Sequence, residues 1–311
     1  MNLKLSFLGT GCSAPTKTRA LTGIVLSFDG KNLLFDCPEG AQKRVLKAGI
    51  SLMKIDCIFF SHFHADHFLG LPGMLATMNM FERDTPLKIF GPKGVEKMVK
   101  KALDIAFVNP GYEIECIELK EGTVLKEKGF GVECFPLEHG TPCFGFVFRE
   151  KDKLGKFNRK KAIRLGVPVG PMFSRLQNGE SVKVEGRTVK PEQVLDTSKG
   201  RRGRSIAIVL DTLPGGSYVK RIKGVDLLVH ESVFLESEAK RARETFHSTA
   251  LRAAKVAKKA GVKKLILTHF SNRYKNPKVI EEEAQKEFSE SIASRELMQI
   301  EIKRKPLGVV K

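Results

Sequence analysis

The chain has 311 residues, of which 41% are hydrophobic and 29% charged, and this balance excludes collagen, low-complexity disorder and coiled coil. No apolar run approaches ~18 residues and no basic-then-apolar leader opens the chain, so we expect neither a membrane partner nor secretion. The formal net charge of +19 suggests a polyanionic partner, although a basic proteome or a thermophile surface would give the same balance. The six cysteines form no CxxC pair, which predicts reduced thiols in the cytoplasm.

Strands and helices are predicted in alternation along most of the chain. Strands are expected over 3–9, 23–28, 32–37, 55–61, 87–91, 131–139 and 143–149, with helices over 41–48, up to about residue 80, and 94–106. After residue 204 we expect strands over 205–212, 226–232, 263–271 and 297–304, with helices over 248–261 and 277–290. The pattern favours an α/β sandwich with mixed sheets.

Residues 149–204 differ from the rest of the chain in charge. They contain 16 Lys and Arg against 6 Asp and Glu, a net charge of +10. Their apolar residues are too sparse to predict a core, so we interpret the segment as an inserted, partly mobile basic arm. The main domain would then comprise residues 1–148 and 205–311. A one-sided charge over so long an insertion favours contact with a polyanion, and the alternative is a solvated surface loop.

The motif SHFHADH contains the strongest chemical signal. It places His62, His64, Asp66 and His67 directly after the apolar strand predicted over 55–61. Imidazole and carboxylate groups are the usual ligands of Zn²⁺ and similar ions. The alternative, an exposed loop that is rich in histidine by chance, is disfavoured because the chain has only seven histidines. The motif therefore predicts a metal site.

Three further ligand-type residues stand at the ends of predicted apolar strands, namely His139, Asp211 and His269. Any one of them alone could be a hydrogen-bonded residue at a strand boundary. Together with the first cluster they supply five histidines and two aspartates. Such a set is sufficient for two metal ions that share a carboxylate and lie ~3.5–4 Å apart.

These motifs resemble the metallo-β-lactamase superfamily and, within it, the ribonuclease Z family of tRNA 3′-processing endonucleases. The segment FLGTGCSAPTKTRA resembles that family's first strand and PxKxRN loop, and LLFDCPEGAQ resembles its DCGEGTQ segment. The basic arm with GVPVGP resembles the family's exosite, and LLVHESVF, HSTALRAAKVA and LILTHFSNRY resemble its later blocks. The resemblance covers residues 3–303 and implies the αββα metallo-β-lactamase sandwich with an inserted basic exosite arm.

The resemblance also implies roles for the site residues. One metal ion would be held by His62, His64 and His139, the other by Asp66, His67 and His269, with Asp211 bridging the two. Asp66 would also be the general base, and His247 the general acid that protonates the leaving oxygen. His230 and Glu231 are expected to orient His247 or a ligand rather than to react.

The expected RNA contacts fall in three places. Lys17 and Arg19 lie in the loop that resembles PxKxRN, and Arg273 lies in the block that resembles HFSNRY. In the arm the candidates are Lys156, Arg159, Lys160, Lys161, Arg164, Gly170 and Pro171. The chain departs from the family pattern at Pro38 and Ala41, beside the site, and at Ala20, where the family has Asn and contacts to the tRNA 3′ end are expected.

The resulting hypothesis is a two-zinc phosphodiesterase that cuts the 3′ trailer from precursor tRNA after the discriminator nucleotide and leaves a 3′-hydroxyl. Mn²⁺ or Fe²⁺ could replace Zn²⁺ at such a ligand set. The resemblance further implies a homodimer in which the arm of one subunit clamps substrate cut by the other. Two alternatives stay open, a hydrolase of small esters or diesters from the same superfamily and a non-catalytic RNA-binding protein with a structural metal.

Overall fold

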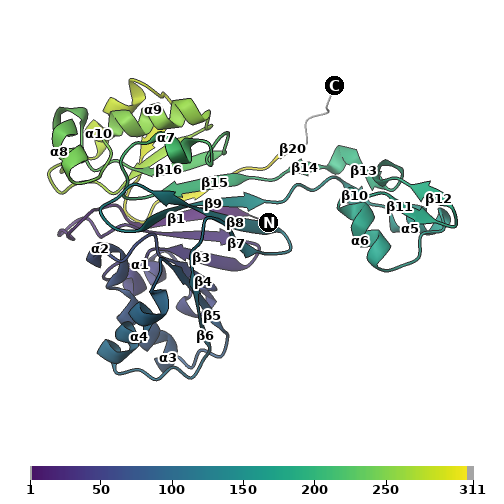
Figure 1. The fold of residues 1–311 in the computed structure, drawn as a ribbon, viewed down its shortest axis with the longest axis horizontal. Coiled ribbons are helices and arrows are strands. Elements are labelled where there is room, and N and C mark those ends of the chain that lie inside the picture. Colours follow the sequence, from purple (N-terminus) through teal and green to yellow (C-terminus); the bar gives the residue numbers. More distant parts are fainter. Residues whose placement is uncertain (1, 307–311) are drawn as a thin grey trace. The chain divides into compact units, whose positions relative to one another are not determined.

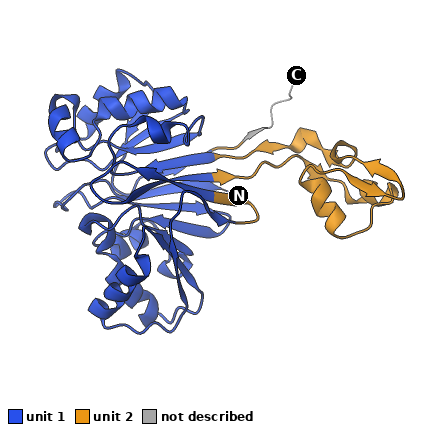
Figure 2. Cartoon of the chain, viewed as in Figure 1, with its two compact units in different colours: residues 1–126, 132–148, 205–302 blue, residues 127–131, 149–204, 303–311 orange. Residues whose placement is uncertain are grey.

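The computed structural model describes residues 2–306, and the chain divides into two compact units (Figure 2). Unit 1 contains residues up to 126, residues 132–148 and residues 205–302. Unit 2 contains residues 127–131, residues 149–204 and the residues from 303 onward. Within the described range, no helix has both the length and the apolar character needed to cross a membrane.

One seven-stranded sheet of unit 1 has the order β19-β1-β2-β3-β4-β5-β6. Its strands are β1 (Leu3–Gly9), β2 (Gly23–Phe28), β3 (Lys31–Phe35), β4 (Cys57–Phe59), β5 (Leu87–Gly91), β6 (Ile114–Glu118) and β19 (Gln299–Glu301). Pairing is antiparallel from β19 to β3 and parallel from β3 to β6. The parallel strands β3 and β4 therefore end at the same edge of the sheet, and the SHFHADH motif begins at that edge.

The second seven-stranded sheet has the order β18-β17-β16-β15-β9-β8-β7. Its strands are β7 (Gly122–Lys126), β8 (Phe130–Leu137), β9 (Cys143–Glu150), β15 (Ser205–Val209), β16 (Leu227–Glu231), β17 (Leu265–Thr268) and β18 (Ser291–Ala293). The run from β15 to β18 is parallel. Asp211, Glu231 and His269 lie at or just beyond the carboxyl ends of three of these strands, so the topology brings them to one edge of the sheet.

Helices cover the outer face of each sheet, as Figure 1 shows. The first sheet carries α1 (Ala41–Lys47), α3 (Leu71–Met80) and α4 (Val95–Ala106), and the second carries α7 (Gly216–Val219), α9 (Ala250–Ala260) and α10 (Lys278–Gln285). Short helices α2 (Ala65–Phe68) and α8 (Ala239–Glu244) and the 3₁₀ turns η1 (Leu52–Lys54) and η4 (Glu236–Glu238) complete unit 1. The helix predicted over 277–290 is shorter in the structure, where α10 ends at Gln285.

Aromatic side chains join the inner faces of the two sheets. The ring centroid of Phe146 on β9 lies 5.3 Å from that of Phe35 and 5.5 Å from that of Phe59. Phe28 and Phe148 meet edge to face at 5.4 Å. With helices outside and aromatic packing between the sheets, unit 1 is an αββα sandwich, as the sequence predicted.

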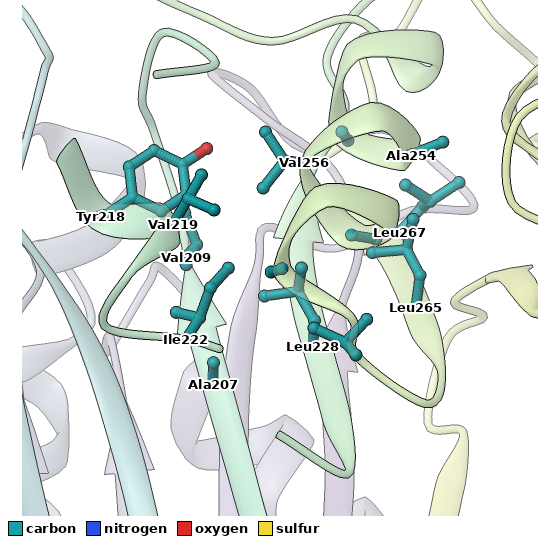
Figure 3. Close-up of a cluster of buried hydrophobic side chains, with 14 of the residues drawn as sticks. Ala207, Val209, Tyr218, Val219, Ile222, Leu228, Ala254, Val256, Leu265 and Leu267 are labelled. Atoms are coloured by element: carbon teal, nitrogen blue, oxygen red, sulfur yellow. The ribbon is translucent and has the colours of Figure 1, made fainter. Parts of the chain in front are cut away.

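The packing of α9 follows directly from its sequence. Thr249 caps its N-terminus by accepting a hydrogen bond from the Arg252 amide, and Gly261 ends it at a φ of 62°. Its buried face is built from small residues, which lets the helix lie close to the sheet. In Figure 3, Ala254 and Val256 of α9 and Val219 of α7 face Leu228 and other side chains of β15, β16 and β17.

Unit 2 corrects one expectation, because residues 149–204 do contain a small hydrophobic core. It is formed by Ala162, Val167, Leu176, Val182, Val189 and Val194. Most of these residues come from α5 (Arg159–Arg164), α6 (Pro171–Gln177), β11 (Val182–Val184) and β12 (Arg187–Val189), while Val167 follows α5 and Val194 lies beyond β12. The further elements of unit 2 are β10 (Lys156–Phe157), η2 (Pro191–Gln193), β13 (Leu195–Asp196), η3 (Thr197–Lys199), β14 (Arg201–Arg202) and β20 (Lys305–Pro306). The apolar residues are sparse in sequence, but the short elements bring them together.

Candidate metal centre

The SHFHADH motif opens at the end of the buried strand β4 and closes in the short helix α2. His62 follows Phe60 and Ser61 and is fully buried. His64 occupies the N-cap position of α2, so Asp66 and His67 lie in the first turn of that helix. Only five residues, 60–64, separate the end of β4 from the start of α2, and this change of direction turns the ligand-type side chains of the motif toward one region of space.

His139, Asp211 and His269 reach the same region from the second sheet. His139 follows β8, Asp211 follows β15 and His269 follows β17. Asp211 has a φ of 48° and His269 a φ of 61°, values in the left-handed region that side-chain-bearing residues seldom adopt. Such conformations persist where surrounding structure enforces them, and they often mark functional sites.

The seven side chains form two groups, each able to enclose a cation. His62, His64, His139 and Asp211 offer ligand atoms that all lie within 4.8 Å of one another, and so do Asp66, His67 and His269. Asp211 lies between the groups. Its Oδ2 is 3.7 Å from His62 Nε2 and 3.4 Å from His67 Nε2, and its Oδ1 is 3.3 Å from His269 Nε2. This arrangement suits a carboxylate that is shared by two ions.

Several of these buried polar atoms have no hydrogen-bond partner, namely His62 Nε2, His67 Nε2, His269 Nδ1 and Asp211 Oδ1. A buried polar atom without a partner costs about 1–3 kcal/mol, so such a cluster needs an explanation. Coordination of metal ions would satisfy His62 Nε2, His67 Nε2 and Asp211 Oδ1 together. The donor set, five imidazoles and two carboxylates, fits a divalent transition metal such as zinc.

Electrostatics in the cluster favour a bound cation. Burial lowers the pKa of His62, and its histidine neighbours lower it further, so this ring is held in the neutral form that ligates metals. Burial alone would raise the pKa of Asp211, but His269 and His67 outweigh it and hold that pKa well below its usual range. Burial lowers the pKa of His67, whereas Asp211 and Asp36 raise it more strongly. The ionised carboxylates thus supply negative charge where a cation would neutralise it.

Hydrogen bonds from outside the ligand set hold the rings in place. Asp36 Oδ2 lies 2.7 Å from His67 Nδ1, and Asp36 also accepts hydrogen bonds from the amide and hydroxyl of Ser61. Ser61 Oγ lies 3.0 Å from His62 Nδ1, and the Phe246 carbonyl oxygen lies 3.1 Å from His139 Nδ1. Asp36 was not predicted as a site residue. Its position directly after strand β3 could have indicated it, because the predicted ligand Asp211 also stands shortly after a strand, two residues beyond β15.

Asp66 is less enclosed than Asp211, with 12% of its side chain exposed. Its Oδ2 accepts a hydrogen bond of 2.6 Å from the amide of Ser13 and lies 3.7 Å from His67 Nε2 and 3.9 Å from His269 Nε2. Burial would raise the pKa of Asp66, but His67 and His269 lower it, and the net direction is downward. An ionised, fixed and solvent-reachable carboxylate results.

His247 stands beside the ligand set without belonging to either group. Its ring centroid lies 5.3 Å from that of His139 and 6.0 Å from that of His269. Its Nδ1 lies 3.1 Å from Oε1 of Glu231, which is fully buried and also accepts hydrogen bonds from the amides of Thr212 and Ser248. Burial lowers the pKa of His247, but Glu231 raises it to about 9. The ring is therefore protonated near neutral pH.

His230 lies further from the ligand groups than His247 does. It is fully buried, its Nε2 is 2.7 Å from the Tyr218 hydroxyl and its Nδ1 is 2.7 Å from the carbonyl oxygen of Glu231. Burial lowers its pKa, so the ring is neutral. His230 therefore contacts the backbone of the residue that holds His247, and its hydrogen-bonding nitrogens face neither group of ligands.

The predicted RNA contacts have different environments. Lys17 is exposed, whereas Arg19 is only 8% exposed and donates hydrogen bonds to the carbonyl oxygens of Ser271, Tyr274 and Lys275. Arg19 therefore ties two loops together, and its contact with RNA stays a prediction. Arg273 is partly exposed and forms an ion pair with Glu238.

The candidates in the arm lie at the surface of unit 2. Five basic side chains are exposed, Lys156, Arg159, Lys160, Lys161 and Arg164, and all of them lie in β10 or α5. Pro171 begins α6 and is also exposed, while Gly170 is half-buried at the N-cap.

Comparison with curated proteins over most of the chain gives one consistent result. The chain is 41% identical to ribonuclease Z of Methanosarcina acetivorans over 98% of this chain and 99% of that one, and 43% identical to ribonuclease Z of Myxococcus xanthus over 88% of each. The chain belongs to the ribonuclease Z family. Residues 3–154 also match the family model described as anti-Pycsar protein Apyc1.

Solved structures agree with the ribonuclease Z assignment. The short form of human tRNase Z aligns with a TM-score of 0.68 at 26% identity, covering 96% of this chain and 98% of that one. The metallo-β-lactamase fold protein YhfI from Bacillus subtilis aligns with a TM-score of 0.70 at 16% identity over 97% of this chain and 100% of that one, a likeness that concerns the fold alone. The predicted metallo-β-lactamase fold is thus confirmed, and the His and Asp groups together with the family support a metal cofactor.

Proposed function

We propose that this ribonuclease Z family member is a metal-dependent endonuclease that removes the 3′ trailer of precursor tRNA. The observation that carries the proposal is the convergence of two ligand groups on Asp211 in a chain that is similar to ribonuclease Z over nearly its whole length. Cleavage after the discriminator nucleotide, leaving a 3′-hydroxyl, is the expected outcome.

We assign one ion to His62, His64 and His139 and a second to Asp66, His67 and His269, with Asp211 shared. The imidazole-rich set favours Zn²⁺, and Mn²⁺ or Fe²⁺ would also be accepted by such ligands. When bound, such ions lower the pKa of water and stabilise negative charge on the phosphate under attack.

Asp66 is the proposed general base. Its carboxylate is ionised, reachable from solvent and held by the Ser13 amide, so it can orient a water molecule and accept its proton. Attack forms a bond from the water oxygen to phosphorus, and the bond from phosphorus to the 3′ oxygen of the discriminator nucleotide breaks, so that the phosphate stays on the 5′ end of the trailer. The 3′ oxygen leaves as an alkoxide unless it receives a proton.

His247 is the proposed general acid. Glu231 keeps its ring protonated near neutral pH, and the ring lies between the His139 and His269 sides of the site. It can therefore donate a proton to the 3′ oxygen of the discriminator nucleotide as the bond to phosphorus breaks. Glu231 positions the ring, and His230 in turn contacts the Glu231 backbone.

We further propose that the basic arm binds the tRNA. Exposed lysine and arginine side chains grip phosphates without reading sequence, and folded RNA is recognised largely by shape and backbone. A small core in unit 2 would hold these cations on a folded surface. The charge of this segment, +10, is the feature that a hydrolase of small esters would not need.

The homodimer and the cytoplasmic location remain proposals. The homodimer rests on the family resemblance, and the cytoplasmic location on the six free cysteines, which suit a reducing compartment.

A mixing experiment tests the homodimer. Chains that lack residues 155–199 are mixed with chains that carry Asp211→Ala. If the arm of one subunit serves the site of the other, the mixture cleaves precursor tRNA better than either variant alone, whereas no gain would argue against that arrangement.

The direct test of the main proposal is incubation of the metal-loaded protein with a 3′-extended precursor tRNA. We expect one cut after the discriminator nucleotide, with a 3′-hydroxyl on the tRNA and a 5′-phosphate on the trailer. Hydrolysis of small diesters without any cleavage of the tRNA would favour another hydrolase of the superfamily. Binding of RNA without cleavage of either substrate would favour a non-catalytic protein.

A further inference from the structure

Phe246 is an exposed aromatic residue at the border of the metal centre, within unit 1. Its carbonyl oxygen lies 3.1 Å from His139 Nδ1, and His139 Nε2 lies 3.8 Å from Oδ2 of Asp211. One imidazole ring therefore separates the Phe246 backbone from the carboxylate that lies between the two ligand groups. The carbonyl oxygen of Phe246 holds His139, whereas its ring, in a residue that is 40% exposed, has no part in the ligand set or in the proposed mechanism.

The backbone of Phe246 has a conformation that residues with side chains seldom adopt, with a φ of 58°. The described part of the chain has ten non-glycine residues with a positive φ, and half of them gather at the metal centre. These five are Ser13, Asp36, Asp211, Phe246 and His269. The other four are ligands or hold a ligand by a hydrogen bond. Phe246 thus shares a backbone feature with residues whose side chains or amides serve the site.

Glycine would be the favoured residue at this position if the carbonyl oxygen were the only group of Phe246 that mattered. Glycine adopts a positive φ without a steric penalty and would present the same carbonyl oxygen to His139. The chain instead places a large apolar ring there, which adds backbone strain and leaves apolar surface in water. The ring is therefore a candidate contact for a ligand that comes to the metal centre.

The space beside the ring is open. Among residues 2–306, no other aromatic ring and no cation packs on the Phe246 ring. A Cβ added to the exposed Gly140 would meet only Phe246 Cδ2, at 3.8 Å, so the missing side chain leaves room against the ring. Gly140 does not have a positive φ, so its backbone conformation does not require glycine. A flat apolar ring with room beside it is the kind of surface on which a nucleobase stacks.

The position of Phe246 in the chain indicates which base would reach it. Phe246 directly precedes His247, which we propose to protonate the 3′ oxygen of the discriminator nucleotide. That oxygen belongs to the discriminator ribose, so this ribose comes to His247 when the tRNA is cut. The base on the same ribose is then within reach of the neighbouring Phe246 ring, whereas the trailer lies beyond the scissile phosphate.

We propose that the Phe246 ring stacks on the base of the discriminator nucleotide. The inference rests on the proposed function and adds to it a binding site for one nucleobase. Every base has a flat π face, so the contact orients the nucleotide for the cut without selecting its identity. The ring binds the base while the carbonyl oxygen of the same residue holds His139, which keeps the base next to a metal ligand.

The first test compares Phe246→Ala with Phe246→Tyr, which keeps the ring, on precursor tRNAs with a normal or an abasic discriminator nucleotide. Both variants carry a Cβ at the same φ, so the difference between them reports the ring. On the normal precursor, we expect kcat/KM to fall roughly 5- to 150-fold in Phe246→Ala, as for the loss of one base stack, and to stay within about threefold in Phe246→Tyr. On the abasic precursor, the wild-type protein and both variants should cleave at similar rates, because no base is present to stack.

Two readouts would move if Phe246 had only a structural role, namely metal content and hydrolysis of a small diester that lacks a base. Both should be unchanged in Phe246→Ala, because the carbonyl oxygen that holds His139 remains. Phe107→Ala is the matched control, since Phe107 is 96% exposed and has a φ of 52° at the C-cap of α4. Helix α4 connects the parallel strands β5 and β6, so its C-terminal end lies at the sheet edge opposite the SHFHADH motif. This variant should cleave the normal precursor as the wild-type protein does.

A second measurement does not depend on cleavage. The chain has no tryptophan, so Phe246→Trp introduces a single one whose fluorescence reports stacking. A tRNA that ends with its discriminator nucleotide should quench this emission when it binds to the metal-loaded protein. A tRNA whose last nucleotide is abasic should bind without quenching.

The outcomes separate this inference from the proposed function. An equal loss in Phe246→Ala on the normal and the abasic precursor would overturn the inference, and so would quenching that does not depend on the base. A loss of metal or of small-diester hydrolysis in Phe246→Ala would also overturn it, by showing that the side chain only supports His139. If the wild-type protein cleaves neither precursor, the proposed function fails, and the fluorescence measurement still decides whether Phe246 stacks on a base.

Discussion

The metal centre and the basic arm show two contrasting ways of using polar residues. At the metal centre, His62, His67, Asp211 and His269 are almost completely buried and come from both sheets of unit 1. In unit 2, the basic side chains of β10 and α5 are exposed and lie close together in sequence. At the metal centre, the fold brings together side chains that are far apart in the sequence. On the arm, the number of exposed positive charges matters instead.

This contrast determines how each region should respond to change. Removing one ligand leaves other buried polar groups without partners, so the loss should be steep. Removing one exposed cation deletes a single weak contact, so the loss should be graded and sensitive to salt. The following predictions, ordered from the largest effect to the smallest, test that distinction.

Asp211→Ala should have the largest effect. It removes the carboxylate between the two ligand groups, so we expect a lower metal content and cleavage reduced below detection. The fold should survive, because Asp211 lies beyond the end of β15, the strand whose residues pack in the core. Elemental analysis, circular dichroism and a cleavage assay check this. Two retained ions with near-normal turnover would show that Asp211 is not the bridge.

His247→Ala should lower the rate of precursor tRNA cleavage by about 10²–10⁴-fold, the size of a general acid–base contribution. The metal content should be unchanged, because His247 belongs to neither ligand group. A small diester with a good leaving group should lose much less activity, since its leaving oxygen needs little protonation. Equal losses on both substrates would indicate that His247 positions the phosphate.

Deleting residues 155–199, with a short Gly/Ser joint, should affect binding rather than chemistry. We expect a higher KM for precursor tRNA, a salt dependence of RNA binding that is flatter by about 0.7–0.9 per lost phosphate contact, and unchanged hydrolysis of a small diester. Kinetics at several salt concentrations provide the measurement. If tRNA affinity and salt slope stay the same, the arm is only a solvated surface.

The smallest expected effect is a shift in pH dependence. Because Glu231 raises the pKa of His247 to about 9, the acid form is present below that pH and is lost as the pH rises through it. In Glu231→Gln the pKa of His247 returns toward its ordinary value of 6.5, so the alkaline limb of kcat/KM moves to lower pH. An unmoved limb would mean that another group controls it.

The gathering of the seven candidate ligands could be predicted from the sequence because most of them stand shortly after an apolar strand, and strand ends meet at a sheet edge. Asp36 was missed because its role, holding His67, depends on a contact between residues 31 positions apart. The RNA contact of Arg19 is predicted from the resemblance of its loop to PxKxRN, and the sequence did not indicate that backbone carbonyls hold its guanidinium. The core of unit 2 escaped prediction because its valines lie on separate short elements with no regular period.

The central claim, that two ligand groups joined by Asp211 carry out the cleavage, is tested most directly by metal titration. The protein is freed of metal with a chelator and Zn²⁺ is added stepwise while precursor tRNA cleavage is followed. We predict no activity without metal and a rise that saturates at two ions per chain. Full activity at one ion per chain, or activity that survives complete removal of metal, would contradict the account.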